Sequence, residues 1–87
     1  MPPRVFVDTS AWIAIVDRSE ARHARAAMLY AKLLSSPTIL TTTRLVLAET
    51  YNLISRRISQ VIAMNYLENI NQSSRILMIY PDAQHER

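Results

Sequence analysis

The sequence has 87 residues, no cysteine and no glycine, and a formal net charge of +3 at pH 7. The lack of cysteine excludes disulfides and thiolate metal sites. The lack of glycine excludes phosphate-binding loops, in which glycine lets the backbone approach a phosphate closely. No apolar run approaches the ~20 residues of a membrane span, and Asp8 interrupts the N-terminal apolar run, which argues against a signal peptide. We therefore expect one small domain over residues 1–87, in a reducing cytoplasm.

The basic residues are unusual in kind, because nine of the ten are arginine. The guanidinium group makes bidentate contacts with phosphate, which a lysine cannot make. A basic balance suits a nucleic-acid partner, although many solvated surfaces have the same balance. Charge alone therefore leaves both interpretations open.

The first predicted element is a short strand at residues 5–7, Val-Phe-Val. Its apolarity is continuous rather than alternating, which predicts a strand buried on both faces, as in a parallel sheet. Asp8 ends this strand. Thr9 or Ser10 is then expected to cap a short helix that continues through Ile15.

A longer helix is predicted over residues 18–34. Asp17 and Glu20 have the spacing of a variant capping box at its start, and a Ser-Ser-Pro run ends it. Its apolar stripe at helical spacing consists of Ala27, Tyr30, Ala31 and Leu34.

The next strand is expected at Ile39 and Leu40, which threonines flank. Thr42 or Thr43 can then cap a helix that runs to about Arg57.

Ser59 can cap one more helix, and Asn69 and Asn71 are expected to end it in the role that glycine often takes. The apolar face of that helix is predicted to consist of Ile62, Tyr66 and Ile70. A third apolar strand follows at residues 76–80, and Pro81-Asp82 is expected to begin a further helix.

This order of elements predicts an α/β fold of the three-layer α/β/α type, with a parallel sheet covered by helices on both faces. Active sites of open parallel sheets lie at the carboxyl ends of the strands. Asp8 stands at that end of the first strand, and this position makes it a candidate functional residue.

Asp8 and Glu49 are the two carboxylates whose positions indicate chemistry. Asp8 either caps the following helix or binds a metal. Glu49 has Leu45, Val46 and Leu53 as helical neighbours, so it either extends to water from the edge of the core or has a partner. Two half-buried carboxylates in one cleft would repel each other, and a divalent cation such as Mg²⁺ relieves that repulsion.

Two segments of the sequence resemble the PIN-domain family of metal-dependent ribonucleases, which includes the VapC-type toxins. Residues 5–14, Val-Phe-Val-Asp-Thr-Ser-Ala-Trp-Ile-Ala, resemble the family's opening strand, acid and hydrophobic helix. Residues 43–49, Thr-Arg-Leu-Val-Leu-Ala-Glu, resemble the capped helix that carries its next acid. His23, with alanines after it, also resembles VapC-type members. The resemblance covers essentially the whole chain.

The resemblance implies a site and a function. Asp8 and Glu49 would be the first two metal-binding acids, and Ser10, less surely Thr9, the supporting hydroxyl. Mg²⁺ or Mn²⁺ would be the cofactor, and the reaction would be hydrolysis of RNA phosphodiesters. A toxin of this type would have an antitoxin protein as its partner.

The family's later acids fall beyond the part that this chain resembles, which keeps a second function open. Asp82 follows the third strand, which is ~10 Å from the first in the family's order third-second-first, so it is expected to cap a helix rather than share an ion with Asp8. Glu68 is expected to be a surface residue. The chain could thus be an inactive PIN remnant that binds RNA or an antitoxin. A receiver-like signalling domain is a third possibility, although its strand order differs.

The truncation after the third strand would leave the first strand at the edge of the sheet. An apolar edge strand invites pairing with another chain, so we expect a homo-oligomer or a partner that supplies the missing half. The other possibility is that the chain is a fragment of a longer protein.

The remaining polar and aromatic candidates have plainer interpretations. Asp17 is expected to be a helix cap, and His23 a surface helix residue. Trp12, Tyr51 and Tyr66 are expected in the core rather than as stacking platforms for bases. The candidates for RNA contact are Arg44, Arg56 and Arg57, of which Arg56 shares the helical face of Glu49.

Overall fold

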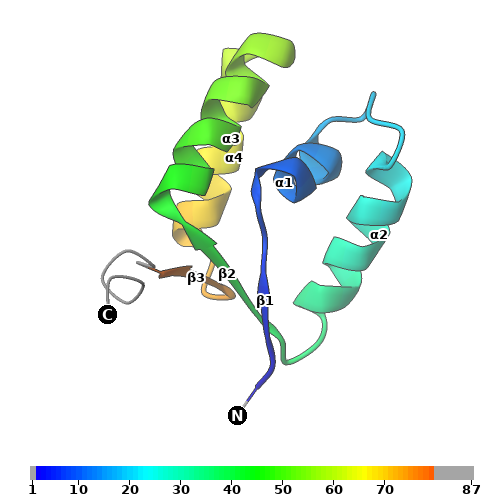
Figure 1. The fold of residues 1–87 in the computed structure, drawn as a ribbon, viewed down its shortest axis with the longest axis vertical. Coiled ribbons are helices and arrows are strands. Elements are labelled where there is room, and N and C mark those ends of the chain that lie inside the picture. The colour runs from blue at the N-terminus through cyan, green and yellow to red at the C-terminus, as the bar shows by residue number, and fades with distance from the viewer. Residues whose placement is uncertain (1, 80–87) are drawn as a thin grey trace.

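The computed structural model describes residues 2–79 as an α/β fold of three parallel strands and four helices (Figure 1). This confirms the predicted fold class. The elements are β1 (Arg4–Phe6), α1 (Thr9–Val16), α2 (His23–Leu34), β2 (Ile39–Thr43), α3 (Arg44–Arg57), α4 (Gln60–Gln72) and β3 (Ile76–Ile79). The last residue of the predicted third strand, Tyr80, and the helix expected from Pro81 with its cap Asp82 lie outside the described residues.

The sheet has the order β1-β2-β3, and both neighbouring pairs are parallel. Thr41 stands at its centre, opposite Phe6 on one side and Leu77 on the other. Among the described residues β1 is therefore an edge strand, as expected. The helices follow the strands in two pairs: α1 packs on α2 and on α3, and α3 packs on α4, so they form a continuous group.

The central strand β2 is buried although three of its five residues are threonines. Their hydroxyls avoid the cost of desolvation by bonding to other groups. Thr41 Oγ1 donates to the Val5 carbonyl at 3.3 Å, and Thr42 Oγ1 donates to the Val7 carbonyl at 3.1 Å. These bonds fasten the central strand to β1 beyond the backbone ladder.

The expectation that residues 5–7 are buried on both faces was wrong. All three residues of β1 are exposed, Phe6 to 51%, and only the following Val7 is buried, at 5% exposure. The reason is position: an edge strand has no neighbour on one side, so its apolar side chains stay open in the described part of the chain.

The long helix also begins later than predicted, at His23 rather than near residue 18. Asp17 ends α1 instead of opening α2, and its Oδ1 accepts hydrogen bonds from the amide and hydroxyl of Ser19. A carboxylate that is satisfied inside a turn competes with its use as a helix cap. Residues 18–22 consequently form turns.

The predicted caps of α3 and α4 were correct, whereas the expectation that Thr9 or Ser10 caps α1 was wrong, and Asp8 has the capping role that was weighed against metal binding. Thr43 accepts from the amide of Val46 and Ser59 from that of Ile62, both at 3.1 Å. The cap of α1 is Asp8, and Thr9 begins the helix. The left-handed role proposed for the asparagines of α4 was also wrong: no described residue has a positive φ, and α4 ends at Ser73 in extended backbone.

Trp12, Tyr51 and Tyr66 pack in or against the core, as expected. Trp12 is 1% exposed and makes edge-on ring contacts with Tyr30 and Tyr66, with centroids 5.8 and 5.5 Å apart. Its indole N–H donates to Thr42 Oγ1 at 3.4 Å. Tyr51 packs against the same core from α3. Trp12 therefore joins α1, α2, α4 and the central strand in one cluster.

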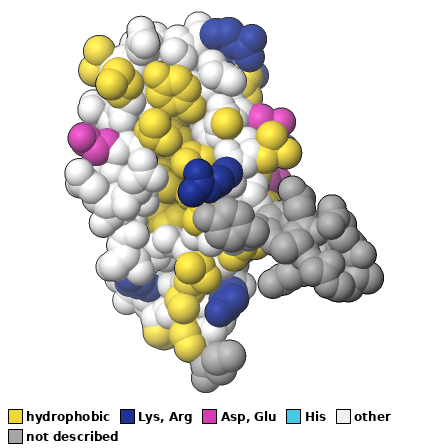
Figure 2. Space-filling view, turned by 90° about the vertical axis from the view of Figure 1, so that its left-hand side faces the viewer, with side chains coloured by type: hydrophobic (Ala, Val, Ile, Leu, Met, Phe, Trp, Pro, Cys, Tyr) yellow, Lys and Arg dark blue, Asp and Glu magenta, His cyan; other side chains and the backbone are white. Residues whose placement is uncertain are grey.

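Not all apolar side chains are covered. The face that α3 and α4 present carries hydrophobic side chains at the surface (Figure 2). Val61 and Met64 of α4 are exposed to 68% and 56%. Within residues 2–79, no helix has the length and apolarity needed to cross a membrane.

Candidate metal centre

Asp8 lies between β1 and α1 and uses one carboxylate oxygen to fix the start of the helix. Its Oδ1 accepts from the Ala11 amide and from the Ser10 hydroxyl, each at 3.0 Å. Within the described part of the chain, Oδ2 accepts no hydrogen bond. Capping and metal binding, which the sequence posed as alternatives, are therefore compatible in this geometry.

Glu49 lies on α3 and reaches the start of α1. Its Oε1 accepts a hydrogen bond from Thr9 Oγ1 at 3.2 Å, across forty positions of sequence. Thr9 directly follows Asp8, so the two acids stand at the same end of the sheet. The cause is topological: β1 and β2 are parallel neighbours, so α1 and α3 start at one edge and pack together.

The two carboxylates are more open than expected. Asp8 and Glu49 are both exposed, whereas the sequence suggested half-buried side chains. The buried face of α3 is formed by Leu47, Thr50 and Ile54, and it leaves Glu49 on the outer side. The site is therefore an open one at the surface, reachable by a large substrate.

The donor set suits a hard divalent cation. Asp8 and Glu49 provide carboxylate oxygens, and the hydroxyls of Thr9 and Ser10 each orient one of them. Mg²⁺ is commonly held by one or two carboxylates and keeps several waters. Within residues 2–79, no group of three or more acids, histidines or cysteines is arranged so that it could hold a metal ion. The residues present thus fit one hydrated ion of the Mg²⁺ or Mn²⁺ kind.

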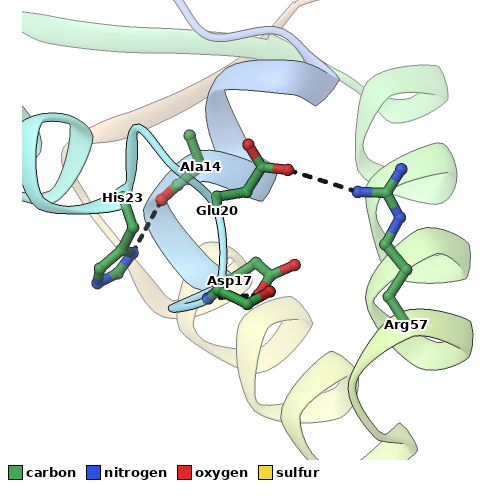
Figure 3. Close-up of polar contacts among 6 residues, drawn as sticks. Ala14, Asp17, Glu20, His23 and Arg57 are labelled. Carbon is green, nitrogen blue, oxygen red and sulfur yellow. Dashed lines mark hydrogen bonds and ion pairs between the residues drawn. The ribbon is translucent and has the colours of Figure 1, made fainter.

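Asp17 does not join this site, because it ends α1 at the end opposite to Asp8. The two hydrogen bonds from Ser19, side chain first, lower the pKa of its carboxyl below the usual value, and the charges of Arg57 and His23 act in the same direction. Figure 3 shows this turn, with Glu20 extending toward Arg57.

His23 has a structural contact that the sequence did not reveal. Its Nδ1 lies 2.9 Å from the carbonyl oxygen of Ala14, which can only accept, so Nδ1 carries the proton (Figure 3). The half-buried ring thereby ties the first turn of α2 to α1. It is neither a metal ligand among the described residues nor a purely surface side chain.

The arginines that were candidates for RNA contact differ in their surroundings. Arg44 begins α3 and is exposed. Arg56 is exposed and lines a shallow depression with Asn52 and Ser55. Arg57 pairs with Glu20 at 3.8 Å. Contact of any of them with RNA stays a prediction.

The model of the PIN domain family matches residues 5–87 of the sequence, nearly its whole length. The chain belongs to the PIN domain family. The match begins at β1 and includes both candidate acids, Asp8 and Glu49.

Within this family, the chain is similar to VapC20 ribonucleases in both sequence and structure. It is 43% identical over 53 residues to the 23S rRNA-specific endonuclease VapC20 of two Mycobacterium tuberculosis strains, CDC 1551 / Oshkosh and ATCC 25618 / H37Rv. These alignments cover 61% of this chain and 38% of each relative. The crystal structure of M. tuberculosis VapC20, described as a toxin that cleaves the sarcin-ricin loop, superposes with a TM-score of 0.73 at 32% identity. This superposition covers 93% of the present chain and 61% of the VapC20 chain. The present chain therefore spans less than two thirds of the length of these relatives.

Two contacts, one at this site and one at the opposite end of the parallel strands, could not be foreseen from local sequence patterns. The bond between Thr9 and Glu49 makes Thr9 as central as Ser10, although the motif favoured Ser10. Arg75, at the start of β3, donates to the carbonyls of Leu34, Ser36 and Thr38. Both contacts depend on how elements about forty residues apart are placed.

Proposed function

We propose that this PIN domain is a metal-dependent endoribonuclease that hydrolyses RNA phosphodiester bonds, with residues 1–87 acting as one domain. The observation that carries the proposal is the hydrogen bond between Thr9 and Glu49, which brings the second acid to the residue beside Asp8. Family membership supports the reaction class.

The roles of the residues follow from their hydrogen bonds. Asp8 and Glu49 would hold Mg²⁺ or Mn²⁺, which supplies charge stabilisation at the phosphate and a more acidic water when bound. Ser10 donates to Oδ1 of Asp8 and Thr9 to Oε1 of Glu49, so each carboxylate is oriented, and no group in residues 2–79 donates to its second oxygen. Orientation of this kind reduces the entropy that the side chains lose on binding an ion.

The substrate and partner are proposed from the similarity to VapC20, which is named as a 23S rRNA-specific endonuclease. We propose ribosomal RNA as the substrate, a role as the toxin of a toxin–antitoxin pair, and an antitoxin protein as partner in the cytoplasm. Arg44 and Arg56 would contact RNA phosphates near the site.

The test is cleavage of purified 23S rRNA and of a mixed RNA pool in the presence of Mn²⁺. We expect cutting that EDTA, Asp8→Asn and Glu49→Gln each abolish. Asparagine caps helices as well as aspartate does, so Asp8→Asn removes the charge while keeping the start of α1. The matched control is Glu68→Gln, which removes an exposed carboxylate from α4, and it should cut as the native chain does.

A second function is favoured by the acids themselves, because residues 2–79 bring only two carboxylates together at this edge. The chain would then be a PIN remnant that binds RNA or an antitoxin without cutting. A folded chain that binds RNA but does not cleave it in Mn²⁺ would establish this function and end the enzyme proposal.

A further inference from the structure

A groove between α1 and the turn that leads into α2 starts beside the candidate metal centre. Ser10 lines one part of it, and Arg22 and Arg25 line another, with Ala14 and Ala21 among the small residues between them. Alanine side chains leave the groove hollow, because they occupy little of the space between the two helices. The groove differs from the site described above in both its position and its charge.

The groove carries a net positive charge, from two arginines and one glutamate. Arg22 and Arg25 are both exposed, and neither forms an ion pair with a described residue. Glu20 also lines the groove, but it pairs with Arg57 of α3 at 3.8 Å (Figure 3). That pair directs the one carboxylate toward α3 and offsets its charge, so an anion in the groove would meet two free guanidinium groups.

The groove is connected to the candidate metal centre through a single side chain. Ser10 lines the groove, and its hydroxyl donates to Oδ1 of Asp8. From Ser10 to Ala14 is four residues of α1, a rise of about 6 Å. The groove therefore runs along at least about 6 Å of α1, starting at the residue whose hydroxyl donates to Asp8.

We propose that this groove binds the phosphate backbone of the RNA on one side of the scissile bond, with Arg22 and Arg25 as phosphate contacts. The inference rests on the proposed function and adds a substrate-positioning surface to it. Guanidinium groups bind phosphate in bidentate fashion. An acidic protein segment would match the arginines equally well but would be repelled by Asp8 and Glu49 at the other end. A polynucleotide meets those acids through the metal.

The experiment measures RNA binding separately from cleavage, by fluorescence anisotropy of a labelled single-stranded RNA on chains that all carry Asp8→Asn. The groove variant is Arg22→Gln/Arg25→Gln. The matched control is Arg18→Gln/Lys32→Gln, which removes the same charge from exposed positions of the same turn and helix outside the groove. A third variant, Ala21→Leu, fills the groove and leaves every charge in place.

We expect the groove variant to weaken RNA binding at least about tenfold. The slope of log affinity against log salt concentration should become shallower by about 1.4, because each lost phosphate contact with a single strand removes about 0.7 from it. Ala21→Leu should weaken binding as well, and the control should change affinity by less than about threefold through general charge.

Equal losses in the groove variant and the control would overturn the inference, because diffuse charge would then explain binding. So would RNA binding that all three variants leave unchanged. Competition by poly-glutamate that matches competition by unlabelled RNA and depends on the two arginines would also overturn it, in favour of an acidic protein partner. Arginine-dependent RNA binding by a native chain that cuts no RNA would support the groove while ending the nuclease proposal.

Discussion

At the scale of single residues, Asp8 illustrates how one side chain serves both fold and site. Capping α1 is worth about 0.5–2 kcal/mol, and asparagine or serine would cap equally well. The helix therefore does not require an aspartate at this position. The second carboxylate oxygen, which no described group donates to, leaves the negative charge available for the proposed metal ion.

Asp17 is the residue for which we predict a dependence of stability on pH. Hydrogen bonds from Ser19 lower the pKa of this carboxyl in the folded chain below its ordinary value of 3.8. A group with a lowered folded pKa contributes stability above its unfolded pKa and loses that contribution as pH falls through the folded pKa. Asp17→Asn should therefore destabilise the chain most at neutral pH, and the difference from the native chain should shrink as the pH falls below 3.8, the ordinary pKa of this carboxyl.

The measurement for Asp17 is urea unfolding of the native chain and Asp17→Asn at several values between pH 7 and pH 2.5. Glu68→Gln serves as the control, since it removes an exposed carboxylate on α4. A difference between native chain and Asp17→Asn that stays constant over the whole range would contradict the prediction.

At the scale of elements, Arg75 holds together three segments that the sheet alone does not fasten. Its guanidinium donates to the carbonyls of Leu34, at the end of α2, and of Ser36 and Thr38, in the loop that enters β2. These carbonyls include one of the unpaired groups at a helix C-terminus. The positive charge also suits that end of the helix dipole.

Removing this contact should cost measurable stability. We expect Arg75→Ala to lower the free energy of unfolding by about 1.5–3 kcal/mol, the range for hydrogen bonds to charged groups. Arg75→Lys should recover less than half of the loss, because an ammonium group lacks the planar fork that reaches several carbonyls. Urea denaturation gives both values, with Lys32→Met as the control for a lost surface charge. A lysine variant as stable as the native chain would show that charge alone matters.

The elements also show which parts of the fold follow from sequence. Thr43 and Ser59 were predictable as caps because each stands directly before a helical pattern. The start of α2 was not, since Asp17 can cap a helix or close a turn, and the His23 contact with Ala14 that fixes the turn is tertiary. The exposure of β1 was not predicted, because an apolar run indicates that a strand favours burial but does not show which elements cover it.

The candidate site could also be predicted only in part from the sequence. The position of Asp8 follows from the end of a strand, which local sequence gives. Its relation to Glu49 through Thr9 depends on how α1 lies against α3, and no local pattern specifies that packing. Family resemblance supplied the pairing of the acids, and the structure supplied the hydroxyl between them.

At the scale of the whole molecule, the side of β1 that residues 2–79 leave uncovered is the feature that suits a partner. Val5 and Phe6 are exposed to 37% and 51%, and both line an apolar groove that continues to Leu29 and Leu33 of α2. An edge strand with unpaired backbone groups beside an apolar surface is a template for pairing with another strand. A second copy offers the identical edge, and a two-fold axis would join the two β1 strands antiparallel.

We therefore predict that the chain is a dimer in solution, with twice the 10.0 kDa mass of a single chain. Phe6→Lys should give the monomer, because a charge on an edge strand opposes pairing. Light scattering after gel filtration measures the mass, and Val61→Lys, which places the same charge on an exposed position of α4, should remain dimeric.

Antiparallel strands end in opposite directions, so the two candidate metal centres would lie at opposite edges of the joined sheet, each complete within its own chain. Mixing native and Asp8→Asn chains should then lower cleavage only in proportion to the native chains present. A steeper loss, or a native chain of 10.0 kDa, would contradict this arrangement.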